Sequence, residues 1–182
     1  MTLRDSALVT LRGWTAPDAG QEALRARYVA HLEAHADAAY RQCRPDHLTA
    51  GALVVSADLE RVLLTLHAKA GRWFQLGGHC EPGDRSLADA ALREATEESG
   101  VAGLLLDPDP VHLDEHPVTF CGEPGLVHHL DVRFVALAPP DAVPVVSAES
   151  TDVRWWPVAD LPEPDTGLVA ASLQRLRRRT SG

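Results

Sequence analysis

The chain has 182 residues, of which 45% are hydrophobic, and a formal net charge of -9 at pH 7. This length and apolar content suit one domain with one sizeable core. The negative charge argues against a surface built for a nucleic-acid backbone, because such binding rests on phosphate neutralisation by lysine and arginine. No apolar run approaches the roughly 20 residues that cross a bilayer, and the first residues do not show the charged-then-apolar pattern expected of a signal sequence.

The cysteines indicate a reducing compartment. Cys43, Cys80 and Cys121 form no C-x-x-C pair and are odd in number, whereas disulfide frameworks usually use an even number. We therefore expect a cytoplasmic protein that contacts no membrane and does not bind nucleic acid.

The first part of the chain predicts a helix followed by strands. Apolar residues recur at helical spacing between about 18 and 35. Two apolar runs at 49–56 and 61–67 then predict a hairpin of strands, and a short strand at 73–76 leads into a glycine-rich loop.

The helix after this loop has clear start and stop signals. Ser86 is the predicted N-cap, and Gly100 supplies the usual stop. Small and apolar residues at spacings of three and four predict the face toward the core. These residues are Ala88, Ala91, Leu92 and Ala95.

The remaining chain predicts further strands and a last helix. Strands are expected at 111–118 and 126–138, joined by a turn at 121–125. Another strand is expected at 152–158, and a final amphipathic helix begins at 165 or 166.

The helix before Gly100 ends in glutamates, where the helix dipole disfavours negative charge. Glu94, Glu97 and Glu98 stand at i, i+3 and i+4 and project from roughly one face. Their repulsion costs about 0.2–0.5 kcal/mol per pair in an exposed helix. A hard divalent cation would convert this cost into a site, because Mg²⁺ prefers oxygen ligands. A solvated helix face is the alternative.

Residues 77–101, G-G-H-C-E-P-G-D-R-S-L-A-D-A-A-L-R-E-A-T-E-E-S-G-V, resemble the Nudix box of the MutT-like Nudix hydrolases. The family pattern is Gly, five residues, Glu, seven residues, then Arg-Glu-apolar-x-Glu-Glu-x-Gly-apolar. Here Asp84 replaces the first glutamate, and eight residues separate it from Arg93. The box is therefore a variant with one extra residue, and its R-E-x-x-E-E-x-G part is intact.

The resemblance implies an α+β fold, in which a mixed β-sheet lies between helices as an α/β/α sandwich. It covers about residues 47–162, which we expect to form the Nudix hydrolase domain. Residues 1–46 would be an N-terminal helical extension, and 163–182 a C-terminal helix packed on the same domain.

The resemblance also implies an activity: hydrolysis of a diphosphate linkage in a nucleoside diphosphate joined to another group, by water attack on phosphorus with Mg²⁺ or Mn²⁺. The partner would be a small nucleoside diphosphate derivative, and a homodimer is left open. Arg93 would orient Glu97, and the general base would be Glu98 or Glu149. The implied metal ligands are Glu94, Glu97, Glu98 and the carbonyl of Gly78.

A second group of polar residues lies outside the box. Histidine and aspartate alternate at 112–116 and, with an arginine, at 129–133, so antiparallel pairing of these strands could bring them together. The group could hold substrate or a second metal, and a hydrated sheet face is the alternative. Trp73 could stack on a base or serve packing. The candidate substrate contacts are His79, Trp73, His112, His129 and Asp131.

Two other functions stay open. The altered spacing of the box motivates a module that senses a nucleotide without cleaving it. Cys80, in the glycine loop, motivates an enzyme resembling isopentenyl diphosphate isomerase, although a small buried thiol is the alternative for this residue.

Overall fold

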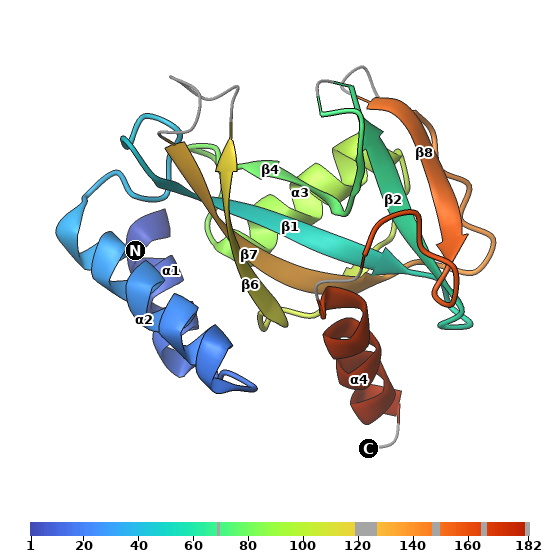
Figure 1. Cartoon of the computed structure of the whole chain (residues 1–182), viewed down its shortest axis with the longest axis horizontal. Helices are drawn as coiled ribbons and strands as arrows, with labels where there is room; N and C mark the ends of the chain where they lie inside the picture. The colour runs from blue at the N-terminus through green and yellow to red at the C-terminus, as the bar shows by residue number, and fades with distance from the viewer. Residues whose placement is uncertain (69, 119–126, 147–149, 165–166, 181–182) are drawn as a thin grey trace.

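The structure is a computed structural model of the chain, and it describes all residues except 69, 119–126, 147–149, 165–166 and 181–182. Along the chain, two helices are followed by strands β1 to β4, helix α3, strands β5 to β8 and helix α4, as Figure 1 shows. The helices are α1 (Leu3–Gly13), α2 (Ala19–Ala34), α3 (Leu87–Ser99) and α4 (Leu168–Thr180). The strands are β1 (His47–Val55), β2 (Arg61–His67), β3 (Trp73–Phe74), β4 (Leu76–His79), β5 (Leu105–Leu106), β6 (His112–Val118), β7 (Val127–Leu137) and β8 (Ser150–Pro157).

One mixed sheet contains all the strands. Its main path runs β3-β2-β1-β7-β5, while β4 pairs with β1, β6 with β7 and β8 with β2. Strands β1 and β7 are parallel, from His47 beside His129 to Val55 beside Leu137, and the other pairings are antiparallel. The predicted α+β class and the mixed sheet are confirmed.

Strand β1 shows how the two faces of the sheet differ. Leu48 and Ala50 belong to the hydrophobic cluster that includes α3, whereas Leu53 and Val55 belong to the cluster that includes α4. The positions at a spacing of two before Leu53 are Gly51, Thr49 and His47, and side chains at that spacing share a face. The α4 face is therefore apolar near α4 and polar toward the start of β1.

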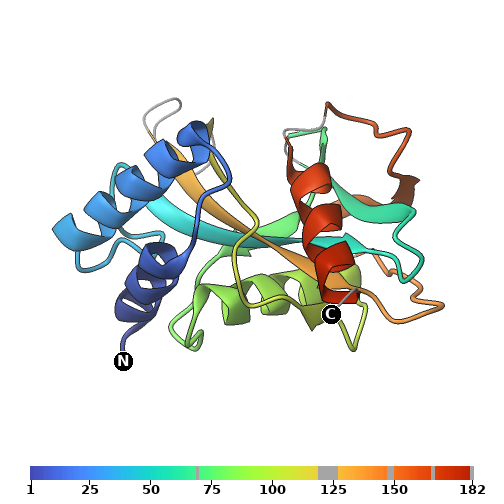
Figure 2. The ribbon, with the colours of Figure 1, turned by 90° about the horizontal axis from the view of Figure 1, so that it is seen from below.

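The N-terminal helices α1 and α2 lie beside each other at one end of the sheet in both views (Figures 1 and 2). Leu11, Tyr28 and Leu32 are fully buried in the same hydrophobic cluster as strands β1 and β7. The hydroxyl of Tyr28 donates to the carbonyl oxygen of Asp114 on β6 at 2.6 Å. The two helices thus complete the core of the sheet.

Helix α1 was not among the predicted elements, although α2 matches the helix expected at 18–35. The signal for α1 was present, because Thr2 and Asp5 form a capping box at its start. Leu3, Ala7 and Leu11 follow at helical spacing and are buried.

Helix α3 begins and ends as predicted. The Ser86 hydroxyl accepts from the Asp89 backbone N–H at 3.0 Å, and Gly100 has the left-handed φ of 67°. The expected apolar face was only partly right. Ala91 and Ala95 are buried, but the stripe continues through Leu87 and Ala90, while Ala88 and Leu92 are partly buried. Strands β1 and β4 pack on α3 and cover this side of it.

Other expectations concern the later part of the chain. The strand expected at 152–158 is β8, and the last helix is α4. The turn expected at 121–125 and the helix start expected at 165 or 166 lie outside the described residues. None of the helices in the described part of the chain has the length and apolar character that a membrane span requires.

Candidate active site

The box glutamates lie next to a close contact between β1 and β4. Gly77 and Gly51 are register partners, and a Cβ atom on Gly77 would lie 2.6 Å from the Gly51 Cα. This separation is possible only because neither residue has a side chain. The backbone N–H of Gly77 donates to Glu98 Oε2 at 2.8 Å, so the strand fixes the orientation of this buried carboxylate.

The next residue, Gly78, lies against Glu94. A Cβ atom on Gly78 would be 2.8 Å from the carboxylate carbon and from both carboxylate oxygens. Any side chain at this position would therefore displace Glu94. The loop backbone and the Glu94 carboxylate are close enough for both to contribute oxygen atoms to one site.

Arg93 connects the loop to the helix. Its Nε and Nη2 atoms donate to the two oxygens of Asp84 at 3.1 and 3.0 Å. Its Nη1 donates to Glu94 at 3.0 Å and to Glu97 at 3.2 Å, and Nη2 also donates to the His79 carbonyl at 3.0 Å. The hydrogen bonding that Arg93 donates to Asp84 is the largest cause of the raised pKa of Arg93.

The contacts of Asp84 show what the two departures from the box pattern do. Asp84 is buried, pairs with both ends of the Arg93 fork and accepts the Glu81 backbone N–H at 2.7 Å. The Asp84 carboxylate therefore fixes the position of Arg93 and links it to the backbone of the loop at Glu81. The expected interaction between Arg93 and Glu97, which lie one helical turn apart, is also present.

The site has a marked excess of negative charge. The Arg93 guanidinium contacts Asp84, Glu94 and Glu97, and the carboxylate of Glu98 accepts a hydrogen bond from Gly77 on β4. The Glu94 and Asp84 side chains are only 15% and 6% exposed, whereas Glu97 is 61% exposed. Several carboxylates gathered next to a backbone that approaches Glu94 closely fit a divalent cation such as Mg²⁺, because this ion prefers hard oxygen ligands.

The second polar group assembles as the alternation predicted. Strands β6 and β7 pair antiparallel, so three facing pairs of side chains share the polar face. The pairs are His112 with Arg133, Asp114 with Asp131, and His116 with His129. Arg133 is buried and donates to Asp131 at 2.8 Å and to Asp114 at 2.9 Å.

The carboxylates of this group have several partners within the protein. Asp131 also accepts from the Thr49 hydroxyl at 3.0 Å and from the Gln75 side chain at 3.1 Å. The hydrogen bond with His116 is the main cause that lowers the pKa of Asp114. Since Gln75 immediately precedes β4, these contacts connect the polar face to the strand that carries Gly77 and Gly78.

Two further histidines meet His129: His79, which is also a candidate substrate contact, and His47, which was not among the predicted site residues. His47 is fully buried on β1, and its Nε2 lies 3.2 Å from Nε2 of His79. Both rings lie with their centroids 5.0 Å from that of His129. Finding His47 from sequence required the parallel pairing of β1 with β7, which local patterns do not reveal.

The remaining candidates lie in different surroundings. The Trp73 ring meets Trp156 edge-on at 5.2 Å, and the Arg154 guanidinium lies 5.1 Å from the Trp73 ring centroid. Cys80 is buried, and burial raises the pKa of its thiol to about 12, so the neutral thiol predominates at physiological pH. Glu149 lies outside the described residues.

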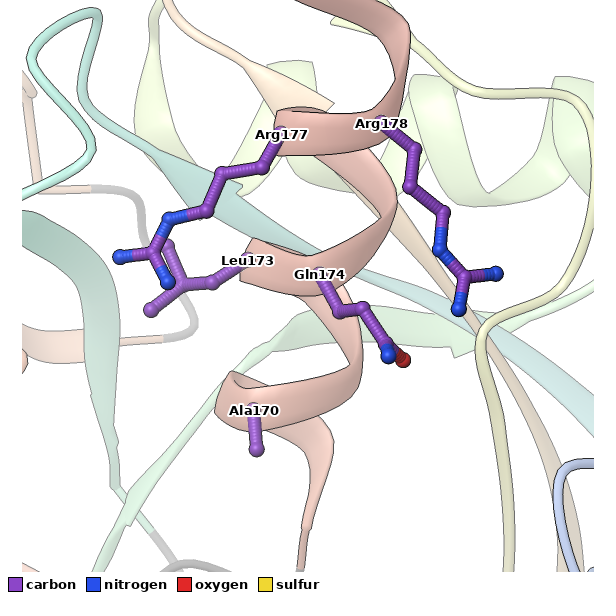
Figure 3. Close-up of a pocket in the computed structure, with 5 residues that line it drawn as sticks. All are labelled: Ala170, Leu173, Gln174, Arg177 and Arg178. Carbon is purple, nitrogen blue, oxygen red and sulfur yellow. The ribbon is translucent and has the colours of Figure 1, made fainter. Parts of the chain in front are cut away.

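A pocket lies against α4, and Figure 3 shows the side chains that line it. All five lining residues come from this one helix, and none belongs to the box or to the polar face. They are Ala170, Leu173, Gln174, Arg177 and Arg178. This surface is separate from the candidate active site.

Comparison with known proteins agrees with this geometry. The model of the NUDIX domain family matches residues 45–176. A NUDIX-family hydrolase from Clostridium perfringens is 22% identical with a TM-score of 0.58, covering 73% of this chain and 97% of its own.

Two further solved structures share the fold. The NUDIX domain of Shewanella oneidensis NrtR, in complex with ADP ribose, is 23% identical with a TM-score of 0.55, covering 76% of this chain and 90% of its own. An Ap4A hydrolase from C. elegans is 17% identical with a TM-score of 0.57, covering 74% and 98%. With the family model spanning most of its length, and with its glutamates arranged around Gly77 and Gly78, the chain belongs to the NUDIX domain family.

Proposed function

We propose that the protein is a metal-dependent hydrolase that cleaves a diphosphate linkage in a nucleoside diphosphate derivative. The observation that carries this proposal is the position of Glu94 and Glu98 against the backbone of Gly77 and Gly78, with Arg93 as the cation that contacts the cluster. Phosphoryl transfer needs placement of the reactants and charge neutralisation more than covalent help from the protein.

The metal would be Mg²⁺ or Mn²⁺. We assign Glu94, Glu97, Glu98 and the Gly78 carbonyl as the residues that would hold it. When bound, such an ion lowers the pKa of a coordinated water and neutralises charge on phosphate oxygens. Arg93 positions Glu94 and Glu97 through its Nη1 atom, and it is itself held by Asp84.

We assign Glu98 as the general base, with Glu149 as the alternative. Glu98 is buried, and the N–H of Gly77 holds one of its oxygens at 2.8 Å. A carboxylate in a fixed orientation can accept a proton from the attacking water without reorganising first.

We infer that the rest of the substrate extends over the polar face of the sheet. Strand β4 leads from the box glycines to this face, where His79, His112, His129 and Asp131 are the candidate contacts. Trp73, on β3, is the candidate for base stacking. The two related structures suggest substrate classes to test first, because one contains ADP ribose and the other is named an Ap4A hydrolase.

The test is cleavage of a panel that includes ADP ribose, Ap4A, nucleotide sugars and nucleoside triphosphates, with Mg²⁺ or Mn²⁺. Glu97→Gln and Glu98→Gln are compared with the wild type, and Glu60→Gln, which changes an exposed glutamate outside the site, is the control. We expect cleavage of one class that is lost in both box variants and kept in the control. Binding without cleavage would instead support a nucleotide-sensing module.

A further inference from the structure

We propose that His47, His79 and His129 form a second cation site, which binds a divalent transition metal such as Zn²⁺ through imidazole nitrogens. Among the residues that the structure describes, these three place one ligand atom each within 4.8 Å of one another. The site differs in chemistry from the oxygen-rich box and does not depend on the proposed hydrolase activity.

The strand pairings bring these histidines together from distant parts of the sequence. His47 and His129 are register partners in the parallel pair of β1 and β7, while β4 pairs with β1 on its other side and places His79 beside Thr49. Thr49 and His47 are two positions apart on β1 and therefore share a face. Three strands thus direct imidazoles to one point on the polar face.

The ring geometry is convergent. The three ring centroids are 5.0–5.2 Å apart, and the interplanar angles are 33°, 60° and 89°, so the rings do not stack in parallel. The Nε2 atoms of His47 and His79 are 3.2 Å apart. Tetrahedral Zn²⁺ with Zn–N bonds of about 2.0–2.1 Å places neighbouring ligand nitrogens about 3.3 Å apart. The His47–His79 pair already matches that spacing, and the ligand atom of His129 lies within 4.8 Å of the other two.

A backbone carbonyl orients the most buried ring. Nδ1 of His47 lies 3.3 Å from the carbonyl oxygen of Cys43, which can only accept a hydrogen bond. Nδ1 therefore carries the proton, and Nε2 directs its lone pair toward His79. Metal-binding histidines are commonly held in this way by a hydrogen bond from the other ring nitrogen.

The ligand set selects the class of metal. Imidazole suits zinc, copper, nickel and iron, whereas Mg²⁺ prefers oxygen. Three histidines leave a fourth position for water or another ligand. His79 also ties this site to the box, because its carbonyl oxygen accepts from Arg93 Nη2 at 3.0 Å. A metal bound here would brace the end of β4 beside the active-site loop.

The test uses the full chain, stripped of metal with a chelator and then kept in excess Mg²⁺ to occupy the carboxylates. Co²⁺ is added as a spectroscopic probe, and Zn²⁺ is then added to displace it. We expect one Co²⁺ per chain with visible absorption bands of a four-coordinate site. At a hundredfold excess of Zn²⁺ over its Kd, the Tm should rise by roughly 5–10 °C.

Variants locate the binding to the proposed ligands. His79→Ala and His129→Ala should weaken Co²⁺ binding at least tenfold, whereas His67→Ala, on β2, should leave it unchanged. His79→Cys should retain binding and add a thiolate-to-cobalt charge-transfer band, which a purely structural role for His79 would not produce. Absence of saturable binding in Mg²⁺, or binding that both alanine variants and the cysteine variant leave unaltered, would overturn the proposal.

Discussion

Asp84 forms hydrogen bonds with Arg93 although an aspartate side chain is one methylene shorter than the glutamate of the family pattern. Both of its oxygens meet the guanidinium, and the carboxylate is almost fully buried. A fork-to-fork pair of this kind fixes the plane of the arginine as well as its position. Glu94 and Glu97 contact the same guanidinium, so their positions depend on Asp84 in turn.

Asp84→Ala should lower the free energy of unfolding by about 1–3 kcal/mol, because it leaves a largely buried guanidinium with fewer partners. Urea denaturation measures this change. Arg85→Ala is the matched control, since it removes the exposed pair with Asp89 and should cost at most about 0.5 kcal/mol. If both variants lose the same free energy of unfolding, the buried pair of Asp84 with Arg93 contributes no more to stability than the exposed pair of Arg85 with Asp89.

Gly78→Ala should act on the metal site more than on stability. The new Cβ would lie 2.8 Å from the Glu94 carboxylate, which can move because it is the end of a flexible side chain. We expect Mn²⁺ affinity, measured by electron paramagnetic resonance, to fall about tenfold or more. Gly83→Ala is the control in the same loop, because its Cβ would meet nothing within 4 Å. Unchanged affinity in Gly78→Ala would remove this glycine from the site.

Helix α3 concentrates its carboxylates in its last turns, and no basic residue lies in its last turn. Negative charge at this end of a helix is electrostatically unfavourable. It is offset by Arg93, one turn earlier in the same helix, which pairs with Glu97, and by the backbone N–H of Gly77 on β4, which donates to Glu98. Gly100 then ends the helix in the left-handed conformation and allows the chain to turn away.

Gly100→Ala should destabilise the protein by about 1–2 kcal/mol, because an L-residue resists the φ of 67°. The added Cβ would also lie 3.0 Å from the Cβ of Val145. Thermal unfolding followed by circular dichroism gives the comparison with Gly13→Ala. A Cβ atom on Gly13, the last residue of α1, would meet nothing within 4 Å. Gly13→Ala should therefore leave the stability unchanged or raise it by up to about 1 kcal/mol. A Gly100→Ala variant as stable as this control would contradict the argument.

At the scale of the whole molecule, the N-terminal helices share one core with the sheet. Tyr28 and Leu32 have no exposed surface and belong to the cluster that also holds Leu48 and Leu130. A core that spans both parts of the chain should unfold as one cooperative unit.

Leu32→Ala should therefore destabilise the entire protein by about 2–5 kcal/mol through the cavity it creates. Urea transitions followed by far-ultraviolet circular dichroism and by tryptophan fluorescence should stay coincident. Val9→Ala, at a 65% exposed position of α1, should change stability by less than about 0.5 kcal/mol. An earlier, separate transition of the helical signal would indicate that α1 and α2 unfold independently.

Local patterns predicted the elements whose causes are local. Ser86 and Gly100 delimit α3 by their own capping contacts, and Arg93 and Glu97 meet because they are one turn apart. The pairing of Arg93 with Asp84 depends on the path of a loop, and the meeting of His47 with His129 depends on a parallel strand pair distant in sequence. Local periodicity and residue spacing carry no information about the Arg93–Asp84 contact or about the His47–His129 contact.

The contact between Gly51 and Gly77 has a consequence for how this site is inherited. A Cβ on Gly51 would lie 2.7 Å from the Leu76 carbonyl oxygen, and one on Gly77 would lie 2.6 Å from the Gly51 Cα. A larger residue at either position would meet backbone atoms of the other strand, so a second substitution at the other glycine could not relieve the clash. The signature of this active site is therefore discontinuous, because it includes a glycine on a strand that ends well before the box begins. A relative that conserves every box residue but has a larger residue at position 51 should hold its Glu98 differently.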